Sequence, residues 1–402
     1  MFRIGTAVAC VCLFLLQTST QAYEDRPPLV EQYLHSGQLQ AGEHALQAVL
    51  RQSPKDDEAR FGLGLLQIVR GVERLGQSFF DHGLKNTNNW VPFVRLPVPV
   101  NPDPAPISYA RFRRILDDFC KDMTLADGTL AGITDDNVKL RIRLADIKID
   151  IDGDGQATDR FLDILTKLMG SPPDLLKTNP EFRVHFDRGD VAWFRAYCHL
   201  LSGMLELYLA IDTEAEFHFF AKEIFPRVRP VLSEAEEKVL KDKQMMRSGG
   251  IRISDPKRLS QFRYHLVEVC KLNRETWRYI RAETDDDYEW LPNSRQKGVF
   301  GMPVREEMIN SWLSMMDELE AILEGKKLLP VDMIMHNTDG KGLNLKTLLE
   351  DPPGKIDFDM VMRDGPAAKY LEKGPSMDLN AIFSVMRVFD NPLRMGYFAW
   401  FN

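Results

Sequence analysis

The chain has 402 residues, and its 51 lysine and arginine side chains are outnumbered by 59 aspartate and glutamate side chains, for a net charge of −8. Nucleic-acid binding depends on cationic side chains that neutralise phosphates, so an acidic chain without a basic tail argues against DNA or RNA as a partner. The length is two to three times that of a typical domain and is sufficient for a substantial hydrophobic core.

The first 22 residues have the layout of a secretory signal peptide. Arg3 precedes an apolar run over residues 7–16, and the small residues Thr20 and Ala22 occupy the positions expected before a cleavage site. The apolar run is well short of the roughly 20 residues that span a bilayer as a helix. We therefore predict cleavage after Ala22, a mature chain exported to the periplasm or the extracellular space, and no membrane span in that mature chain.

Residues 23–90 contain an internal period that predicts paired helices. At an offset of 34 residues, leucine and glycine recur in the pairs Leu29 and Leu63, Gly37 and Gly71, and Gly42 and Gly76. Small residues allow helices to cross closely, and Pro54 ends one helix before the next begins.

The segment from about 27 to 85 resembles the tetratricopeptide repeat. Residues 45–54 are similar to the second helix of one repeat, and residues 59–66 to the first helix of the next. The family's tryptophan is missing, as is the closing proline of the second repeat. The resemblance implies helical hairpins that bind a protein or peptide partner. An ordinary pair of helical hairpins is the alternative.

The rest of the chain predicts a larger helical body. Six prolines within residues 91–106 indicate an extended connector, because proline fixes φ and removes backbone donors. Helical periodicity then returns in a region at 107–247, with its longest apolar block at 191–225, and in a C-terminal region at 248–402. There we predict helices at 259–280, 305–323 and 377–388, and we expect the aromatic chain end, 397–402, to dock on the core.

Residues 150–155 have the composition of a cation-binding loop. Asp150, Asp152 and Asp154 alternate with other residues, and Gly155 stands at the sixth position. Hard cations such as Ca²⁺ take oxygen ligands at this spacing, with glycine at six for the sharp turn. The segment 150–161 resembles an EF-hand loop, which implies three aspartate ligands, the Gln156 carbonyl, and Thr158 through its hydroxyl or a water.

The resemblance fails at the twelfth position, where Phe161 replaces a bidentate glutamate. We therefore expect weak calcium binding, which suffices at extracellular concentrations of roughly 0.1 to 1 mM. A single loop favours a structural clamp over a sensor. Residues 161–168 predict an outgoing helix, whereas residues 138–149 fit either a strand or a helix. The alternative for the loop is a solvated acidic turn.

The sequence contains no recognised catalytic motif of the hydrolase, metalloprotease or nucleotide-binding kind. The cysteines that remain after cleavage lie in apolar stretches and are predicted to be buried and inert: Cys120, Cys198 and Cys270. For an enzyme, the informative observation is a deep pocket in which His199, His218 or His265 meets carboxylates. The tripeptide Arg188-Gly189-Asp190 is interpreted as a helix start.

Taken together, these patterns predict a mainly α protein with little β structure, in which tetratricopeptide-like hairpins pack on a larger helical body. The predicted function is an exported scaffold that binds a protein or peptide and carries one structural calcium-binding loop. The alternative is an exported, hydrolase-like enzyme with its active site in residues 191–330.

Overall fold

The computed structural model describes residues 26–85, 96–164, 178–179, 181–231, 233, 235–236, 238, 250–286, 289–299, 301, 303–330, 340–356 and 368–388. In these residues the protein is mainly helical, and every strand is only two or three residues long. The predicted mainly α class with little β structure is therefore confirmed.

The N-terminal helices are α2 (Leu29–Ser36), α3 (Leu39–Gln52) and α4 (Asp57–Asp81), which all pack on one another. The turn between α3 and α4 contains Pro54, and α4 begins where the Asp56 side chain accepts a hydrogen bond from the Ala59 backbone N–H at 2.9 Å. Side-chain caps of this kind satisfy backbone donors that a helix leaves unpaired.

α4 is one continuous helix of 25 residues. A second hairpin at the 34-residue offset would need a turn inside this span, so the repeat is not confirmed. Two of the glycines that suggested it allow close contacts of α4 with α5 and with the acidic loop instead. An added Cβ at Gly71 would lie 2.8 Å from the end of Met123, and one at Gly76 would lie 3.0 Å from Ile151.

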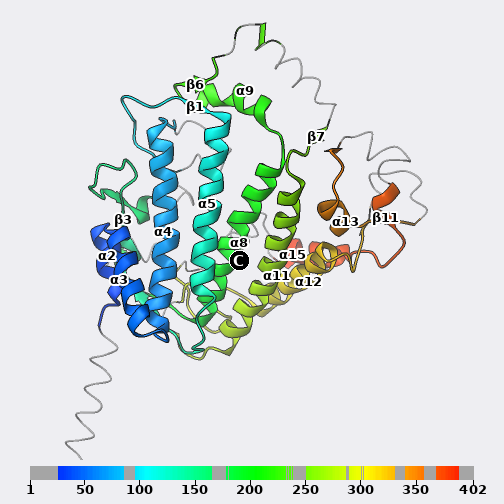
Figure 1. The fold of residues 1–402 in the computed structure, drawn as a ribbon. Helices are drawn as coiled ribbons and strands as arrows, with labels where there is room; N and C mark the ends of the chain where they lie inside the picture. The colour runs from blue at the N-terminus through cyan, green and yellow to red at the C-terminus, as the bar shows by residue number, and fades with distance from the viewer. Residues whose placement is uncertain are drawn as a thin grey trace, which may run out of the picture.

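The body is a row of long helices beside α4, formed by α5 (Tyr109–Leu130), α8 (Arg188–Ala210) and α11 (Pro256–Ala282) (Figure 1). Beyond α11 lie α12 (Glu306–Leu323) and α15 (Leu379–Val388). One cluster of buried apolar side chains runs from Val30 in α2 to Val385 in α15. The N-terminal helices and the body therefore share a core.

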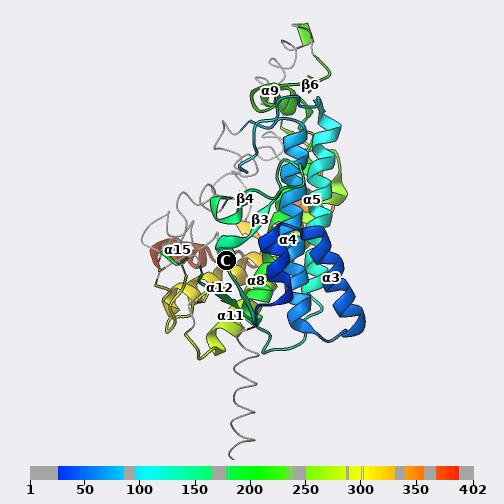
Figure 2. The same ribbon diagram turned by 90° about the vertical axis from the view of Figure 1, so that its left-hand side faces the viewer.

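The short strands join distant segments. They pair as β1 (Ile107–Ser108) with β6 (Val228–Arg229), β2 (Leu140–Ile142) with β5 (Val184–Phe186), β3 (Lys148–Ile149) with β4 (Asp159–Arg160), β7 (Ile251–Arg252) with β10 (Lys355–Ile356), and β9 (Gly342–Leu343) with both β8 (Leu329–Pro330) and β11 (Leu371–Glu372). Single 3-10 turns occupy Leu144–Asp146 and Ala368–Tyr370. Seen from the side, β3 and β4 lie on one flank of α4 (Figure 2).

The helices predicted at 259–280, 305–323 and 377–388 are α11, α12 and α15, so these predictions are confirmed. The block at 191–225 is instead two helices, α8 and α9 (Glu214–Ile224). Contacts from α5 replace helical bonds at the break: Arg113 donates to the Ile211 carbonyl at 3.1 Å, and the Thr213 N–H donates to the Tyr109 hydroxyl at 3.0 Å. The short helix α13 (Leu345–Glu350) was not predicted.

Cys120, Cys198 and Cys270 are free and buried, as predicted. Burial raises the pKa of Cys120 and of Cys270 to about 12, so both thiols stay protonated and unreactive. None of the described helices has the length and apolar character needed to cross a membrane. The predicted signal peptide at 1–22 and the aromatic run at 397–402 lie outside the described residues.

Candidate metal centre and apolar cavity

The acidic loop connects β3 to β4, and the residue pairs Lys148–Arg160 and Ile149–Asp159 close its base. Residues 138–149 hold the strands β2 and β3 with a single 3-10 turn at Leu144–Asp146 between them, so the segment is not one continuous strand and the α-helix alternative is wrong. A helix begins directly after β4, at residues 161–164. The rest of the predicted outgoing helix, residues 165–168, lies outside the described residues, and the loop is entered from a strand.

Three of the five predicted ligands come together in this loop. Asp150, Asp152 and Asp154 each place a carboxylate oxygen within 4.8 Å of the other two. The two oxygens of Asp150 accept the backbone N–H groups of Gly153 at 2.8 Å and Gly155 at 3.0 Å. Both glycines have positive φ, 71° and 85°, which residues with a Cβ rarely adopt. This arrangement of oxygens fits a hard divalent cation.

The electrostatics of the loop also favour a cation. Partial burial, together with the neighbouring carboxylates of Asp150 and Asp154, raises the pKa of Asp152 above its usual value. Three carboxylates this close repel one another, and a divalent cation between them converts the repulsion into attraction.

The remaining predicted ligands, Gln156 and Thr158, lie exposed on the same loop. Gln156 donates to Asp154 from its backbone N–H at 2.7 Å and from its side-chain amide at 3.4 Å. Phe161, at the position of the missing glutamate, packs against the hydrophobic core. The side chain at the twelfth position is therefore directed to the core and supplies no ligand.

Glu73 of α4 is a part of this site that the sequence did not reveal. Its carboxylate accepts the Asp150 backbone N–H at 3.1 Å, and the Gln77 side chain donates to the Asp150 carbonyl at 2.8 Å. Burial raises the pKa of Glu73 to about 7. The sequence offered one indication of this role, which is the position of Glu73. It lies four residues after Val69 and three before Gly76, on the otherwise apolar face of α4. These contacts hold the loop against α4.

A large cavity of about 440 Å³ lies among α4, α5, α8 and the segments that flank the loop. Its walls are almost entirely apolar, and they include Leu65, Val72, Phe119, Trp193, Leu201 and Trp290. Ile147, just before β3, and Phe161 and Ile164, just after β4, also line it. The loop and one wall of the cavity are therefore parts of the same segment.

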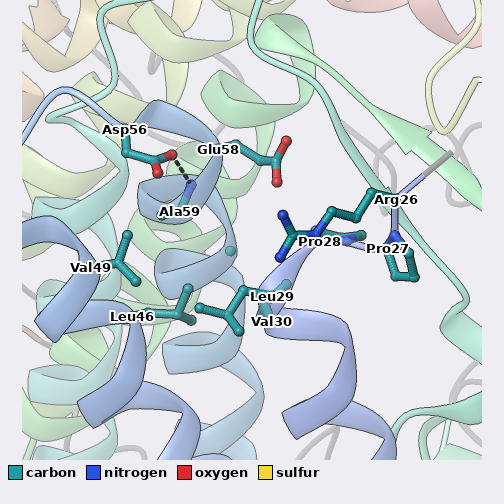
Figure 3. Close-up of a pocket in the computed structure, with 11 residues that line it drawn as sticks. Arg26, Pro27, Pro28, Leu29, Val30, Leu46, Val49, Asp56, Glu58 and Ala59 are labelled. Carbon is teal, nitrogen blue, oxygen red and sulfur yellow. Dashed lines mark hydrogen bonds between the residues drawn. The ribbon is translucent and has the colours of Figure 1, made fainter. Parts of the chain in front are cut away.

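A smaller pocket of about 180 Å³ lies among the N-terminal helices. Figure 3 shows Asp56 and Glu58 at the top, Arg26 at the right, and the apolar Val49 and Leu46 below Asp56 at the left. Burial, assisted by the neighbouring Asp56, raises the pKa of Glu58. The pocket is large enough for a single side chain or chain end.

No protein-family model, curated protein or solved structure matches the chain. The tetratricopeptide and EF-hand resemblances therefore stay predictions that rest on local residue patterns. Any function must be inferred from the contacts of this chain itself.

The candidate catalytic histidines lie apart from the cavity. The Nδ1 atoms of His199 and His265 are 2.8 Å apart, and His199 Nε2 is 3.4 Å from the Asp127 carboxylate. Arg195 also pairs with Asp127, at 2.8 Å. His218 is buried separately, in α9. Among the described residues that line the cavity there is no histidine, so the condition set for catalysis, a deep pocket where histidine meets carboxylate, is not met there.

The histidine pair predicts a pH-dependent stability. Burial and the neighbouring His199 lower the pKa of His265 to about 4, although Asp127 and Glu268 oppose the shift. The unfolded chain binds this proton near the ordinary histidine pKa of about 6.5, so the stabilisation is complete above that pH and is lost as the pH falls towards 4. Between about pH 7 and pH 5, the free energy of unfolding of the wild type should fall by about 1 kcal/mol more than that of His265→Gln, after allowance for solvent screening.

The measurement is urea unfolding of both proteins across this pH range. His44→Gln, on the exposed face of α3, is the matched control and should follow the wild type. If the His265→Gln curve runs parallel to that of the wild type, the half-buried His265 makes no such contribution.

Proposed function

We propose that the protein is an exported binding protein that holds a neutral, apolar small molecule in its 440 Å³ cavity, and that calcium in the loop of Asp150, Asp152 and Asp154 stabilises one wall of that cavity. The proposal keeps the predicted binding role and the predicted calcium clamp. The expected ligand is a small apolar molecule rather than a peptide.

The observation that carries the proposal is the position of Ile147, Phe161 and Ile164. These side chains line the cavity, and the two-stranded base of the loop lies between Ile147 and Phe161 in the sequence. A cation that orders residues 150–158 therefore restricts where all three side chains lie. Weak binding is enough for this role, because extracellular calcium sites work at roughly 0.1 to 1 mM.

The chemistry of the walls defines the ligand. Well-packed interiors leave few voids larger than a water molecule, whereas ligand pockets of roughly 300–1,000 Å³ are mostly apolar. The lining includes the hydroxyl-bearing Tyr197 and Tyr208. Burial raises the pKa of Tyr197 to about 12, so its hydroxyl stays neutral. A charged ligand would lose its hydration in this cavity without finding a charged partner among the described lining residues. A neutral molecule such as a long-chain alcohol therefore fits the cavity.

The test uses a brominated long-chain fatty alcohol, which quenches tryptophan fluorescence on contact. Trp193 and Trp290 line the cavity, so binding should produce saturable quenching. Val72→Phe places a larger side chain in the cavity and should weaken binding at least tenfold, whereas Val72→Ala should bind as well as the wild type. Calcium should strengthen binding severalfold, and Asp152→Asn should abolish that effect.

Two controls separate the parts of the proposal. Calcium at tenfold to hundredfold excess over the Kd of the loop should add about 1.4 to 2.7 kcal/mol to the stability of the wild type through this site, and Asp152→Asn should lose that contribution. Glu58→Gln, in the smaller pocket, should leave quenching unchanged. Absence of saturable quenching, or equal binding by Val72→Phe, would exclude the cavity as the site. Equal calcium stabilisation of Asp152→Asn would exclude the loop.

A second candidate function is the capture of a peptide by the tetratricopeptide-like helices. The small pocket in Figure 3 favours it, because Arg26, Asp56 and Glu58 offer both signs of charge beside apolar side chains. Its volume admits one residue of a peptide, so most of the affinity would have to come from the surrounding surface. The hydrolase-like alternative has less support, since the paired histidines lie outside the cavity.

A further inference from the structure

Four carboxylates meet where the beginning of α8 approaches the end of α11. Asp187 is the N-cap of α8 and Asp190 lies in its first turn, while Glu283 directly follows α11 and Glu289 lies further along the same segment. Asp187, Glu283 and Glu289 each bring an oxygen within 4.8 Å of the other two. Asp190 interacts electrostatically with all three. We call these four residues the α8–α11 acidic cluster.

The Asp190 side chain is the second indication of a ligand. It is only 3% exposed. Its Oδ2 accepts the Asp187 backbone N–H at 3.0 Å, as half of a capping box, but its Oδ1 is buried without a hydrogen-bond partner in the described part of the chain. In Glu283, Oε2 accepts from Gln296 at 3.2 Å, while Oε1 is buried, receives no N–H donor there and faces the carboxyl group of Asp187. Burial of an unpaired carboxylate oxygen is costly.

Three neighbouring basic side chains pair with other carboxylates, whereas Arg295 donates to the backbone carbonyl of Glu283 at 3.1 Å. Arg188 pairs with Glu275 at 3.1 Å, Lys139 with Asp285 at 2.6 Å, and Arg281 with Glu306 at 2.6 Å. These three ion pairs engage carboxylates outside the α8–α11 acidic cluster.

Gly189 allows the cluster to be compact. A Cβ added there would lie 2.8 Å from Ile280 and 3.3 Å from Oε1 of Glu283. A larger residue would therefore push the end of α11 away from the first turn of α8. Glycine at this position keeps the carboxylates of the two helices close enough to share one ligand.

We propose that the α8–α11 acidic cluster binds a divalent cation of the calcium class. Asp187, Glu283 and Glu289 offer oxygen ligands, which hard cations require, and none of them offers the nitrogen or sulfur that favours zinc or copper. The cation links the start of α8, the end of α11 and the segment that carries Glu289. This site is separate from the loop of Asp150, Asp152 and Asp154, and either one can be correct without the other.

Terbium luminescence tests the site, because Tb³⁺ replaces Ca²⁺ and emits when a nearby tryptophan is excited. Trp290 directly follows Glu289 and is 6% exposed. We expect metal-stripped wild type to give strong tryptophan-sensitised emission that calcium displaces. Glu283→Gln and Asp190→Asn should each reduce the emission at least tenfold, whereas the loop variant Asp152→Asn should retain it.

Calcium stoichiometry from equilibrium dialysis gives a second measurement. Asp152→Asn should retain one bound calcium, and Glu283→Gln should lose one relative to the wild type. Trp290→Phe should keep the wild-type stoichiometry but lose most of the sensitised emission. This result would place the bound ion near Trp290 even if the carboxylate variants do not fold. Emission that disappears in Asp152→Asn, or a wild type whose calcium is all lost in that variant, would overturn the proposal in favour of carboxyl groups that share protons.

Discussion

Phe61→Ala is expected to lower the free energy of unfolding by about 3–5 kcal/mol, the largest effect of any single substitution considered for this chain. Phe61 of α4 is completely buried. Its ring lies 6.0 Å from that of Phe194 in α8 and 6.4 Å from that of Phe186 in β5. Truncation removes both aromatic contacts and leaves a cavity between the N-terminal helices and the body.

Chemical denaturation followed by circular dichroism measures this effect. Phe220→Ala is the matched control, because Phe220 is 47% exposed and its loss should cost within about 0.5 kcal/mol. We also expect one transition in both variants, since α4 shares its core with α8. A cost below about 1 kcal/mol for Phe61→Ala, or a separate early transition of the N-terminal helices, would show that the N-terminal helices fold independently of the body.

Gly37→Ala is expected to cost about 2–4 kcal/mol and to weaken calcium binding by the loop of Asp150, Asp152 and Asp154. Gly37 ends α2 with φ of 68°, a conformation that costs a residue with a Cβ roughly 1 kcal/mol or more. The added Cβ would also lie 2.0 Å from Cβ of Ala157 in the loop. Relief of that clash requires the loop to move, and overpacking of this kind typically costs about 1–3 kcal/mol.

The double variant Gly37→Ala with Ala157→Gly isolates the two causes. It should recover the part of the stability that the clash removes, together with calcium affinity, but not the part that arises from φ. Gly128→Ala is the control, because Gly128 lies inside α5 with open space around it and should gain up to about 1 kcal/mol. Both quantities come from thermal melts at several calcium concentrations. Equal stability of Gly37→Ala and the wild type would show that α2 does not support the loop.

Helices were predictable where one apolar face and a clear end coincide in the sequence. α11 begins with Pro256 after Asp255, whose side chain accepts the Lys257 N–H at 3.1 Å, so both its face and its start are local features. The break between α8 and α9 was not predictable, because the hydrogen bonds that produce it come from Tyr109 and Arg113 in α5. Likewise, the repeat predicted a turn within residues 57–81, but the apolar face of α4 continues through this span and packs on the core as one helix.

The acidic loop was predictable because its chemistry is local. Asp150, Asp152 and Asp154 lie within five residues, and their backbone turn is specified by Gly153 and Gly155. Glu73, which lies far away in the sequence, was missed because a single carboxylate on an apolar helix face gives no indication of its partner.

By itself, the sequence determined the mainly helical class, the positions of the later helices, the buried state of the cysteines and the convergence of three loop carboxylates. Each of these follows from residue spacing within a few turns of the chain. Only the tertiary structure decided that α4 is one helix, that the loop enters from a strand and borders an apolar cavity, and that four distant carboxylates meet between α8 and α11. Those features depend on contacts between distant segments, as between Leu65 and Trp290 around the cavity, and local patterns do not encode such contacts.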